Sequence, residues 1–545
     1  MPNPFVKLWT TFRNTFNEPT TSTALTITPP KTLASGSNGY DASGQGRRAI
    51  GWNASRLGPN TLLTTNQAIL IARSRDSVRN SALARSAIDK WESNVIGSGI
   101  QCHWTHPDPD VRKQLQEAWD RWITTADFNE QLNFYGLQSL VVRELFEAGE
   151  CFARFHVDGD GDTQAVPLQV QLLESEQCPI FRNVLPGNAE WRKDNWSIKQ
   201  GIVFDSVTDR RIGYSMYKGQ PYDTMFDPMG AAQFIFLPKT DCIHVMRPLR
   251  AGQLRGEPQM TAVLTLLYEV ENYSDAERVR KKVASMFAGF LTEPSLENSI
   301  FPPSPAYSTS DVTDPLTAQT YPTSNDPGTD IGQLQPGTLQ KLLPGETIVF
   351  PTLPESGDYD RFMYTELHKF AAGCGVTYEQ LTGDLKGVNY SSIRAGMLEF
   401  RRACEAFQKN IVVNGFCDPV KNRWLKEAVI SGKVQLPEDY FTNPEQYEAC
   451  NWISQGFDWV DPVKEIAAYQ SAVRCGFTSR TQVIRETGFS PEAIDNQNAE
   501  DNKRADDLGI MYDSNPSKIL IGREVQPVNT APPEPDETEE SVSDE

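Results

Sequence analysis

The sequence predicts an α+β protein, and three patterns support this fold class. Between residues 151 and 246, short runs alternate apolar and polar side chains, as half-buried strands do. Residues 257–292 and 391–416 instead repeat apolar side chains every three or four positions, which is typical of amphipathic helices. Helical patterns also predominate from residue 433 to about 510. Strands and helices therefore occupy separate stretches of the chain, as in α+β proteins.

Length and composition limit the possible function classes. The chain has 545 residues, enough for about three or four domains. Its 51 basic and 71 acidic residues give a net charge of −20, which argues against a simple basic nucleic-acid-binding protein. We expect no membrane-spanning helix and no secretory leader, because no apolar run is long enough for either. The nine cysteines form no C-x-x-C pair, so free and mostly buried thiols in a reducing compartment are expected.

The chain is expected to begin with a flexible arm, residues 1–50. Five apolar residues at helical spacing are Phe5, Leu8, Trp9, Phe12 and Phe16. They fit a short docking helix or a disordered peptide equally well. Helical patterns follow at 60–94, 111–125 and 132–148. The arginine row of the first could contact nucleic acid, but a solvated face or ion pairs between subunits suit so acidic a chain better.

Alternating strands are expected after this helical entry. Their ranges are 151–157, 168–172, 201–204, 212–217, 233–237 and 242–246. The turn Asp158-Gly-Asp-Gly-Asp162 joins the first two into a hairpin. A calcium loop would need glycine where Thr163 stands and glutamate where Gln169 stands, so the turn alone is the better explanation. The helices and strands of residues 51–256 thus form one α+β domain.

A long helix is expected from Pro258 to about Thr292, because proline suits the first helical turn and Pro294 is the next break. Its apolar face includes Val279 and Val283. At 1.5 Å per residue such a helix spans roughly 50 Å. It would therefore cross a large domain or join two parts of an assembly.

Residues 293–356 differ in composition from the rest of the chain. They are rich in proline, serine and threonine, and no lysine or arginine occurs from Val283 through Gln340. Residues 299–332 are expected to form a flexible insertion. Short strands are expected at 338–343 and 347–350, on either side of a Pro-Gly turn.

Helices are expected again from residue 359. The first covers about 359–372, after which Thr377 and Gln380 match a capping box. A loop then leads into a helix at 391–416, the cleanest amphipathic pattern of the chain. Its apolar stripe is Ile393, Met397, Phe400, Cys404, Phe407 and Ile411. This helix is expected to end before Asp418-Pro419, with a separate helix over 420–430.

The sequence lacks the motifs of common catalytic sites. It contains no phosphate-binding loop, dinucleotide fingerprint, zinc-protease motif or nucleophile elbow. His103 and His106 lie near Cys102, but too few ligands accompany them for a metal site, and structural histidines are expected. No pair among so many carboxylates stands out as an acid and base. We therefore expect no enzyme, no cofactor and no metal.

Several motifs occur together from residue 342 onward. They are Leu342-Leu-Pro-Gly-Glu346, the run from Glu366 to Gly383, Asn389-Tyr-Ser-Ser-Ile-Arg-Ala395, the run from Asn451 to Glu465, and Gly476-Phe-Thr-Ser-Arg480. In this order they resemble the lambda family of portal proteins from tailed bacteriophages, and the similarity extends over about residues 50–500. The resemblance implies a ring of typically twelve subunits at one capsid vertex of the virion, assembled in the host cytoplasm. Double-stranded DNA would pass through its channel without sequence preference during packaging and ejection.

The resemblance also implies a division of the chain and a set of partners. The implied regions are a wing (51–256), a first stem helix (257–292), a small β-containing clip (293–356), a second stem helix (357–376), a tunnel-loop region (377–391), a long helix leaving the channel (392–432), a mostly helical crown (433–520) and an acidic disordered tail (521–545). The insertion at 299–332 departs from a compact clip. The implied partners are the terminase large subunit, the major capsid protein, scaffold, and a head-completion or tail adaptor.

The tunnel loop is the segment that would line the DNA channel. Its residues are Thr382, Gly383, Asp384, Leu385, Lys386, Gly387, Val388, Asn389 and Tyr390. An acidic wall keeps DNA mobile by repulsion, and Lys386 is the only basic residue within 370–393. One hypothesis is that Lys386 contacts phosphates weakly and checks slippage of the packaged DNA. An exposed lysine without any DNA contact is the alternative.

A ring of more than two copies needs head-to-tail contacts between subunits. The candidates for part of that contact are Ile393, Met397, Phe400, Phe407, Ile411, Val279 and Val283. These stripes could instead face the core of their own subunit. A partner ATPase would supply the energy for packaging, since the chain has no phosphate-binding loop. Another structural protein of the virion head, or a nuclease encoded beside the head genes, is the competing interpretation.

Overall fold

The computed structural model describes residues 54–157, 166–187, 195–223, 225, 233–286, 290–291, 312–313, 320–321, 340–341, 359–387, 389–457 and 462–510. The chain separates into two compact units, Met1–Gly58 and Pro59–Glu545. All helices and strands of the described residues belong to the second unit. The arm at 1–50 and the tail at 521–545, both expected from the sequence, lie outside the described residues.

The second unit begins with four helices. They are α2 (Pro59–Asn80), α3 (Ala82–Val95), α4 (Pro109–Ile123) and α5 (Phe134–Glu147). The helical pattern at residues 60–94 is confirmed, as two helices that Ser81 separates. Ser81 has an extended backbone, and its side chain accepts a hydrogen bond from the Ala84 amide. A serine in this position starts a new helix. The predicted helices at 111–125 and 132–148 are confirmed as α4 and α5.

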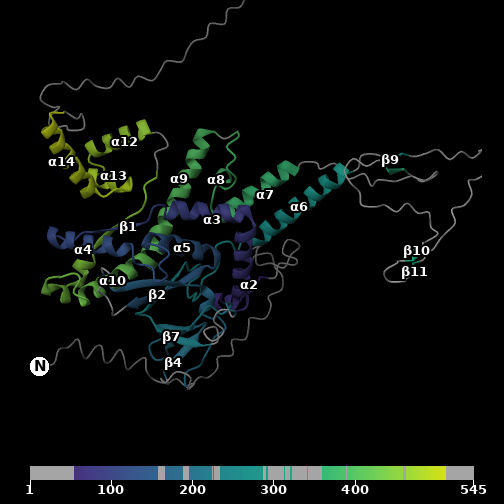
Figure 1. Cartoon of the computed structure of the whole chain (residues 1–545), viewed down its shortest axis with the longest axis horizontal. Helices are drawn as coiled ribbons and strands as arrows, with labels where there is room; N and C mark the ends of the chain where they lie inside the picture. Colours follow the sequence, from purple (N-terminus) through teal and green to yellow (C-terminus); the bar gives the residue numbers. More distant parts are fainter. Residues whose placement is uncertain are drawn as a thin grey trace, which may run out of the picture. The chain divides into compact units, whose positions relative to one another are not determined.

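Two antiparallel sheets follow. The first has the order β3-β2-β8, formed by β2 (Glu150–Val157), β3 (Leu168–Leu173) and β8 (Cys242–Met246). The second has the order β4-β5-β6-β7, formed by β4 (Trp196–Lys199), β5 (Ile202–Asp205), β6 (Arg210–Tyr217) and β7 (Phe234–Pro238). Helix α5 packs against β2 (Figure 1). The predicted pairing of β2 with β3 is confirmed, with Phe155 opposite Val170, while the turn between them lies outside the described residues.

A third sheet joins segments from opposite ends of the described chain. Strand β1 (Gln101–Trp104) pairs antiparallel with β13 (Cys450–Ile453), and Cys102 lies opposite Trp452. Neither strand was predicted from the sequence. Four residues are too few to show a clear alternation, and the pairing brings together positions that no local pattern relates. We call this pair the β1–β13 ribbon.

Helix α6 (Leu264–Met286) corresponds to the long helix expected from Pro258. The predicted start is wrong, because residues 258–263 form turns in which the Val263 amide donates to the Met260 carbonyl at 2.9 Å. Helix α7 (Tyr359–Cys374) packs against α6, with the rings of Tyr273 and Phe362 4.8 Å apart. The expected end at Thr292 lies outside the described residues.

Four very short strands are described between α6 and α7. They are β9 (Phe290–Leu291), β10 (Val312–Thr313), β11 (Thr320–Tyr321) and β12 (Gln340–Lys341). Strands β9 and β12 pair in parallel, and β10 and β11 pair antiparallel. The strand predicted at 338–343 overlaps β12. The strand predicted at 347–350 lies outside the described residues, as does most of 299–332.

Helix α9 (Tyr390–Phe407) continues without a break through a π-helix (Gln408–Cys417) into α10 (Asp418–Ile430). The break predicted before Asp418-Pro419 is therefore wrong. In the π-helix the Asp418 amide donates to the carbonyl of Val413, five residues earlier. This wider turn shifts the preceding carbonyls, one of which would clash with the ring of Pro419 in an α-helix.

The last part of the described chain is mostly helical, as predicted. Its elements after α10 are η6 (Glu438–Phe441), α11 (Pro444–Glu448), strand β13, α12 (Pro462–Arg474), α13 (Arg480–Glu486) and α14 (Pro491–Leu508). Among the described residues, no helix is both long and apolar enough to cross a membrane.

A large apolar core lies among α3, α4, α5, the ribbon, α9, the π-helix and α10. The indoles of Trp119, Trp122 and Trp424 are fully buried there and contact one another. A smaller core between the two larger sheets contains Phe152, Met216 and their neighbours. All nine cysteines are free and seven are buried, which confirms the expectation of free, mostly buried thiols.

Candidate functional site

The segment between α7 and α9 has a defined local structure. Helix α8 (Tyr378–Thr382) begins with the predicted capping box: the Thr377 hydroxyl accepts from the Gln380 amide at 3.2 Å, and the Gln380 side chain accepts from the Thr377 amide at 3.0 Å. The helix ends at Gly383, whose φ of 71° favours glycine. The described residues 383–387 and Asn389 then form a loop that leads into α9. We call these residues the channel loop, after the channel-lining role that the sequence resemblance implies for the tunnel loop, residues 382–390.

The channel loop is ordered by its own polar groups. The Asp384 amide donates to the Thr382 hydroxyl at 3.2 Å, and the Lys386 amide donates to the Asp384 carboxylate at 3.0 Å. The side chains of Leu385 and Lys386 are exposed, Leu385 by 65%. Of the nine residues predicted from the sequence, Val388 lies outside the described residues. Among its described residues, the loop therefore presents the apolar side chain of Leu385 and the cationic side chain of Lys386 to solvent.

Helix α3 fixes the base of the channel loop. The Ser86 hydroxyl donates to the Leu381 carbonyl at 2.9 Å, and the Trp91 indole donates to the Cys374 carbonyl at 2.8 Å. Leu381 itself is buried in the large core. The loop thus extends from a rigid support into solvent.

The apolar stripe of α9 is divided between core and surface. Phe400 and Phe407 are buried, with their rings 5.3 and 5.8 Å from that of Trp91. Ile393 and Met397 are only partly buried. For Phe400 and Phe407 the contacts favour the alternative that the stripe faces its own core.

The other candidates for subunit contact differ in burial. Ile411 is partly buried and packs against the large core. Val279 of α6 is 52% exposed, whereas the side chain of Val283 lies outside the described part. A contact with a neighbouring subunit remains a prediction for the residues that keep exposed surface.

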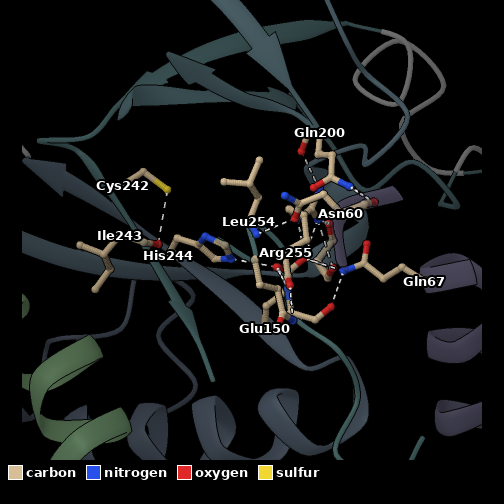
Figure 2. Close-up of polar contacts among 12 residues, drawn as sticks. Asn60, Gln67, Glu150, Gln200, Cys242, Ile243, His244, Leu254 and Arg255 are labelled. Atoms are coloured by element: carbon tan, nitrogen blue, oxygen red, sulfur yellow. Dashed lines mark hydrogen bonds and ion pairs between the residues drawn. The ribbon is translucent and has the colours of Figure 1, made fainter. Parts of the chain in front are cut away.

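A buried polar cluster, which the sequence did not reveal, lies where β2 meets the segment before α6 (Figure 2). Glu150 and Arg255 are completely buried and form an ion pair, with Arg255 Nε donating to Glu150 Oε1 at 2.8 Å. His244 Nε2 lies 2.8 Å from Glu150 Oε2, and the Gly256 amide donates to the same oxygen at 2.6 Å. Gln67, Glu150, Ser175, His244 and Arg255 are called the Glu150 cluster below.

The remaining donors and acceptors of the Glu150 cluster come from several elements. Gln67 of α2 donates to Glu150 at 3.1 Å and to the Gly256 carbonyl at 2.8 Å. The Ser175 hydroxyl donates to Glu150 at 2.6 Å, from the 3-10 helix η3 (Ser175–Gln177). Arg255 also donates to the carbonyl of Gln200 at 2.9 Å. Each hydrogen bond compensates part of the cost of removing these charges from water.

The charge states in the Glu150 cluster follow from these contacts. Burial raises the pKa of Glu150, but Arg255 and His244 together hold it well below its usual range. Burial lowers the pKa of His244, which stays neutral at pH 7. Arg211 lies 3.4 Å from His244 Nδ1, so Nδ1 accepts while Nε2 donates to Glu150. At pH 7 the cluster therefore holds one carboxylate and one guanidinium, and its net charge is zero.

Two glycines allow the backbones to cross beside the Glu150 cluster. A Cβ on Gly256 would lie 2.2 Å from the Gly149 carbonyl oxygen. A Cβ on Gly149, whose φ is 84°, would lie 2.1 Å from the Glu257 carbonyl carbon. Only glycine permits so close an approach. The crossing and the cluster together fix the chain where it leaves the sheets and enters α6.

Comparison with known proteins identifies the family of this chain. The model of a family described as "Phage portal protein, lambda family" matches residues 45–408, well over half of the chain. The chain belongs to the lambda family of phage portal proteins. The resemblance inferred from the sequence motifs is thereby confirmed.

Curated portal proteins are similar over most of their length. The "Probable portal protein" of Halomonas phage phiHAP-1 is 23% identical over 478 residues, which cover 86% of this chain and 85% of the relative. "Portal protein B" of Escherichia phage lambda is 22% identical over 483 residues, covering 83% and 86%. The "Portal protein" of Escherichia phage N15 is 22% identical over 490 residues, covering 84% and 88%.

Solved structures give a weaker likeness. The "Neck of empty GTA particle computed with C6 symmetry" is 13% identical, covers 82% of this chain and 98% of its own, and has a TM-score of 0.37. The "Neck of native GTA particle computed with C12 symmetry" is 13% identical, covers 78% and 99%, and has a TM-score of 0.35. TM-scores this low support no inference about the portal chain.

Family membership settles several expectations. Portal proteins are structural, so the expectation that the chain is no enzyme is confirmed. The α+β fold class is also confirmed, since long helices and separate antiparallel sheets are both present. A phage portal protein belongs to the virion, at the capsid vertex.

Proposed function

We propose that identical copies of this portal protein form a closed ring of twelve subunits, through which double-stranded DNA enters the capsid and later leaves it. Membership in the lambda portal family supports this proposal. The ring is assembled in the host cytoplasm and contacts the major capsid protein and scaffold. It docks the terminase large subunit during packaging and a head-completion or tail adaptor afterwards.

Within the ring, residues 51–256 act as the wing, with α6 and α7 as the stem helices. Residues 293–356 form the clip, residues 433–520 form the crown, and the helix over 392–432 leads outward from the channel. These assignments rest on the order of motifs that resemble the family.

The observation that carries the channel proposal is the geometry of the channel loop. It is short, supported by α3, and exposes Lys386 while its neighbour Asp384 is used to hold the loop in shape. Twelve chains with a charge of −20 carry about −240, so the wall as a whole repels DNA. A single ring of Lys386 side chains would then contact the phosphates weakly and check backward slippage.

The chain must also make contacts that close a ring. Such contacts are head-to-tail, because one self-complementary patch joins only two copies. The candidates with exposed surface are Val279, Ile393, Met397 and Ile411. The energy for DNA movement comes from the terminase, since the chain has no phosphate-binding loop.

Electron microscopy of the purified protein tests the ring directly. Closed rings with a central hole are expected in negative stain, and a chain that stays monomeric under every assembly condition would contradict the proposal. The role of Lys386 is tested separately in phage that carry Lys386→Ala. Packaged DNA should be lost more readily from these virions, while phage with Lys426→Ala, an exposed lysine of α10, should retain DNA like wild type. Equal retention in both variants would remove the role of Lys386.

A further inference from the structure

The β1–β13 ribbon brings a thiol into contact with a buried lysine. Cys102 lies opposite Trp452, and Trp104 lies opposite Cys450, so the two cysteines are diagonal neighbours on one face of the ribbon. Helix α10 supplies Lys421 to that face. Lys421 Nζ is 3.4 Å from Cys450 Sγ, which is hydrogen-bond distance for a sulfur acceptor.

Lys421 is a buried cation with several partners besides Cys450. Its side chain is only 5% exposed, and its ammonium group also donates to the Glu448 carbonyl. Asp418 is the nearby carboxylate, with Oδ1 3.5 Å away. That carboxylate is 40% exposed, and the same Oδ1 accepts from the Trp452 indole at 2.8 Å. The Asp418 carboxylate thus divides its interactions between Lys421 and Trp452, and a thiolate at Cys450 would be a second anion within hydrogen-bond distance of the buried ammonium group.

We propose that Cys450 is a reactive thiolate, paired with Lys421, and that it forms a modification site for peroxides and other soft electrophiles. Cys450 is partly exposed, whereas Cys102 and Cys417 beside it are buried. Of these three thiols, Cys450 therefore lies nearest to solvent. An adjacent cation and partial exposure are the two features that distinguish reactive cysteines from inert buried ones.

The groups around Cys450 agree with a thiolate. Its pKa is lowered by a hydrogen bond from the Cys102 thiol and by the charge of Lys421, against the opposing effects of burial and of Asp418. The pKa of Cys102 is raised well above its ordinary value by burial, and so is that of Cys417. Of these three thiols, Cys450 is therefore the one whose ionisation the surroundings favour.

With hydrogen peroxide, the reaction is a two-electron oxidation of sulfur. The Cys450 thiolate attacks one peroxide oxygen, an S–O bond forms and the O–O bond breaks. The leaving hydroxide takes a proton from solvent and becomes water, and the product is the sulfenic acid of Cys450. The added oxygen lies next to Lys421 on the face of the ribbon that packs against the large core, so it disturbs that packing.

Competitive labelling of the intact protein tests this site. Native protein is treated with iodoacetamide at pH 7 under reducing-agent-free conditions, and peptides are quantified by mass spectrometry over time. Cys475 is exposed and serves as the internal reference. Cys450 should be alkylated about tenfold faster than Cys475 although it is less exposed. A rate for Cys450 equal to or below that of Cys475 would overturn the proposal.

A second measurement keeps the test independent of any variant. The alkylation rate of Cys450 in the wild-type protein should reach half its maximum at a pH below the value near 8.5 of a free thiol. A midpoint at or above that value would refute the thiolate. With hydrogen peroxide and dimedone, a sulfenic-acid adduct should appear on Cys450 and be absent from Cys450→Ser.

The role of Lys421 is tested by Lys421→Met, which keeps the length and apolar stem of the side chain. Alkylation of Cys450 should slow to the rate of Cys475 or below it, while the rate of Cys475 stays unchanged. An unchanged fast rate at Cys450 would show that Lys421 does not activate the thiol.

Discussion

The channel loop and the Glu150 cluster are held in place in opposite ways. The loop is shaped by hydrogen bonds between close neighbours in the sequence, and its Leu385 and Lys386 side chains face solvent. The cluster joins segments far apart in the sequence, and its carboxylate and guanidinium are fully buried. A loop contact can be lost alone, whereas loss of one cluster partner leaves a buried charge without compensation.

This difference matches two tasks in the proposed ring. A surface that lines a DNA channel must touch the duplex without binding it, so weak and exposed groups suit it. The point where the chain passes from the sheets into α6 must instead keep one geometry in every copy, since small errors would accumulate around a ring. The variants below test this contrast, in order of decreasing expected effect.

The largest effect is expected from Arg255→Met. The variant leaves the Glu150 carboxylate buried beside a neutral histidine, and breaking a buried ion pair in this way costs about 3–5 kcal/mol. Urea unfolding followed by tryptophan fluorescence should show this loss of stability. Arg79→Met is the matched control, because Arg79 is 72% exposed, and its stability should change by less than about 0.5 kcal/mol. Equal unfolding midpoints for the two variants would mean that the cluster does not hold the fold.

A smaller loss is expected from Gly256→Ala. The added methyl group would lie 2.2 Å from the Gly149 carbonyl oxygen, so the crossing backbones must separate. Overpacking of this kind typically costs about 1–3 kcal/mol. Gly58→Ala is the control, since nothing lies within 4 Å of the Cβ position there. A melting temperature for Gly256→Ala as high as that for Gly58→Ala would show that the crossing backbones can accommodate a methyl group.

Local patterns in the sequence predicted much of the fold and the position of the channel loop. Helices α4 and α5, the pairing of β2 with β3 and the capping box at Thr377 depend on residues close together in the chain, and each was confirmed. The loop followed from the same kind of signal, since Gly383 ends one short helix and Tyr390 begins the next.

The Glu150 cluster could not be predicted in this way. Glu150 is one of 71 acidic residues, and its partner Arg255 is 105 positions away. The wrongly predicted helix limits also depend on structure that local patterns do not contain. Pro258 would begin a helix in isolation, but it follows the backbone crossing at Gly149, and α6 starts only at Leu264. The π-helix likewise carries the chain past Pro419.

A pH-dependent effect is expected at a second carboxylate, that of Glu144 in α5, which is 15% exposed. Its pKa is raised to about 7 by burial, despite the ion pair with Arg75 at 3.1 Å. The folded protein therefore favours protonated Glu144. The contribution to stability is full below the unfolded pKa near 4.5 and is lost as the pH rises through 7.

Glu144→Gln should remove this dependence. The difference in melting temperature between variant and wild type should shift in favour of the variant between pH 5 and pH 8. Glu117→Gln is the control, because Glu117 is 61% exposed and should give a difference that does not vary with pH. A constant difference for Glu144→Gln over the same range would show that Glu144 is ionised throughout.

The smallest effect on stability is expected from Lys386→Ala in the channel loop. The Lys386 side chain is exposed, and the loop is held through the Lys386 backbone amide, which alanine keeps. Stability should change by less than about 0.5 kcal/mol, in contrast to the loss for Arg255→Met. Any loss of DNA retention in the virion would then come from the missing charge and not from a damaged fold. A clear drop in melting temperature would mean that the loop shares the tight constraints of the Glu150 cluster.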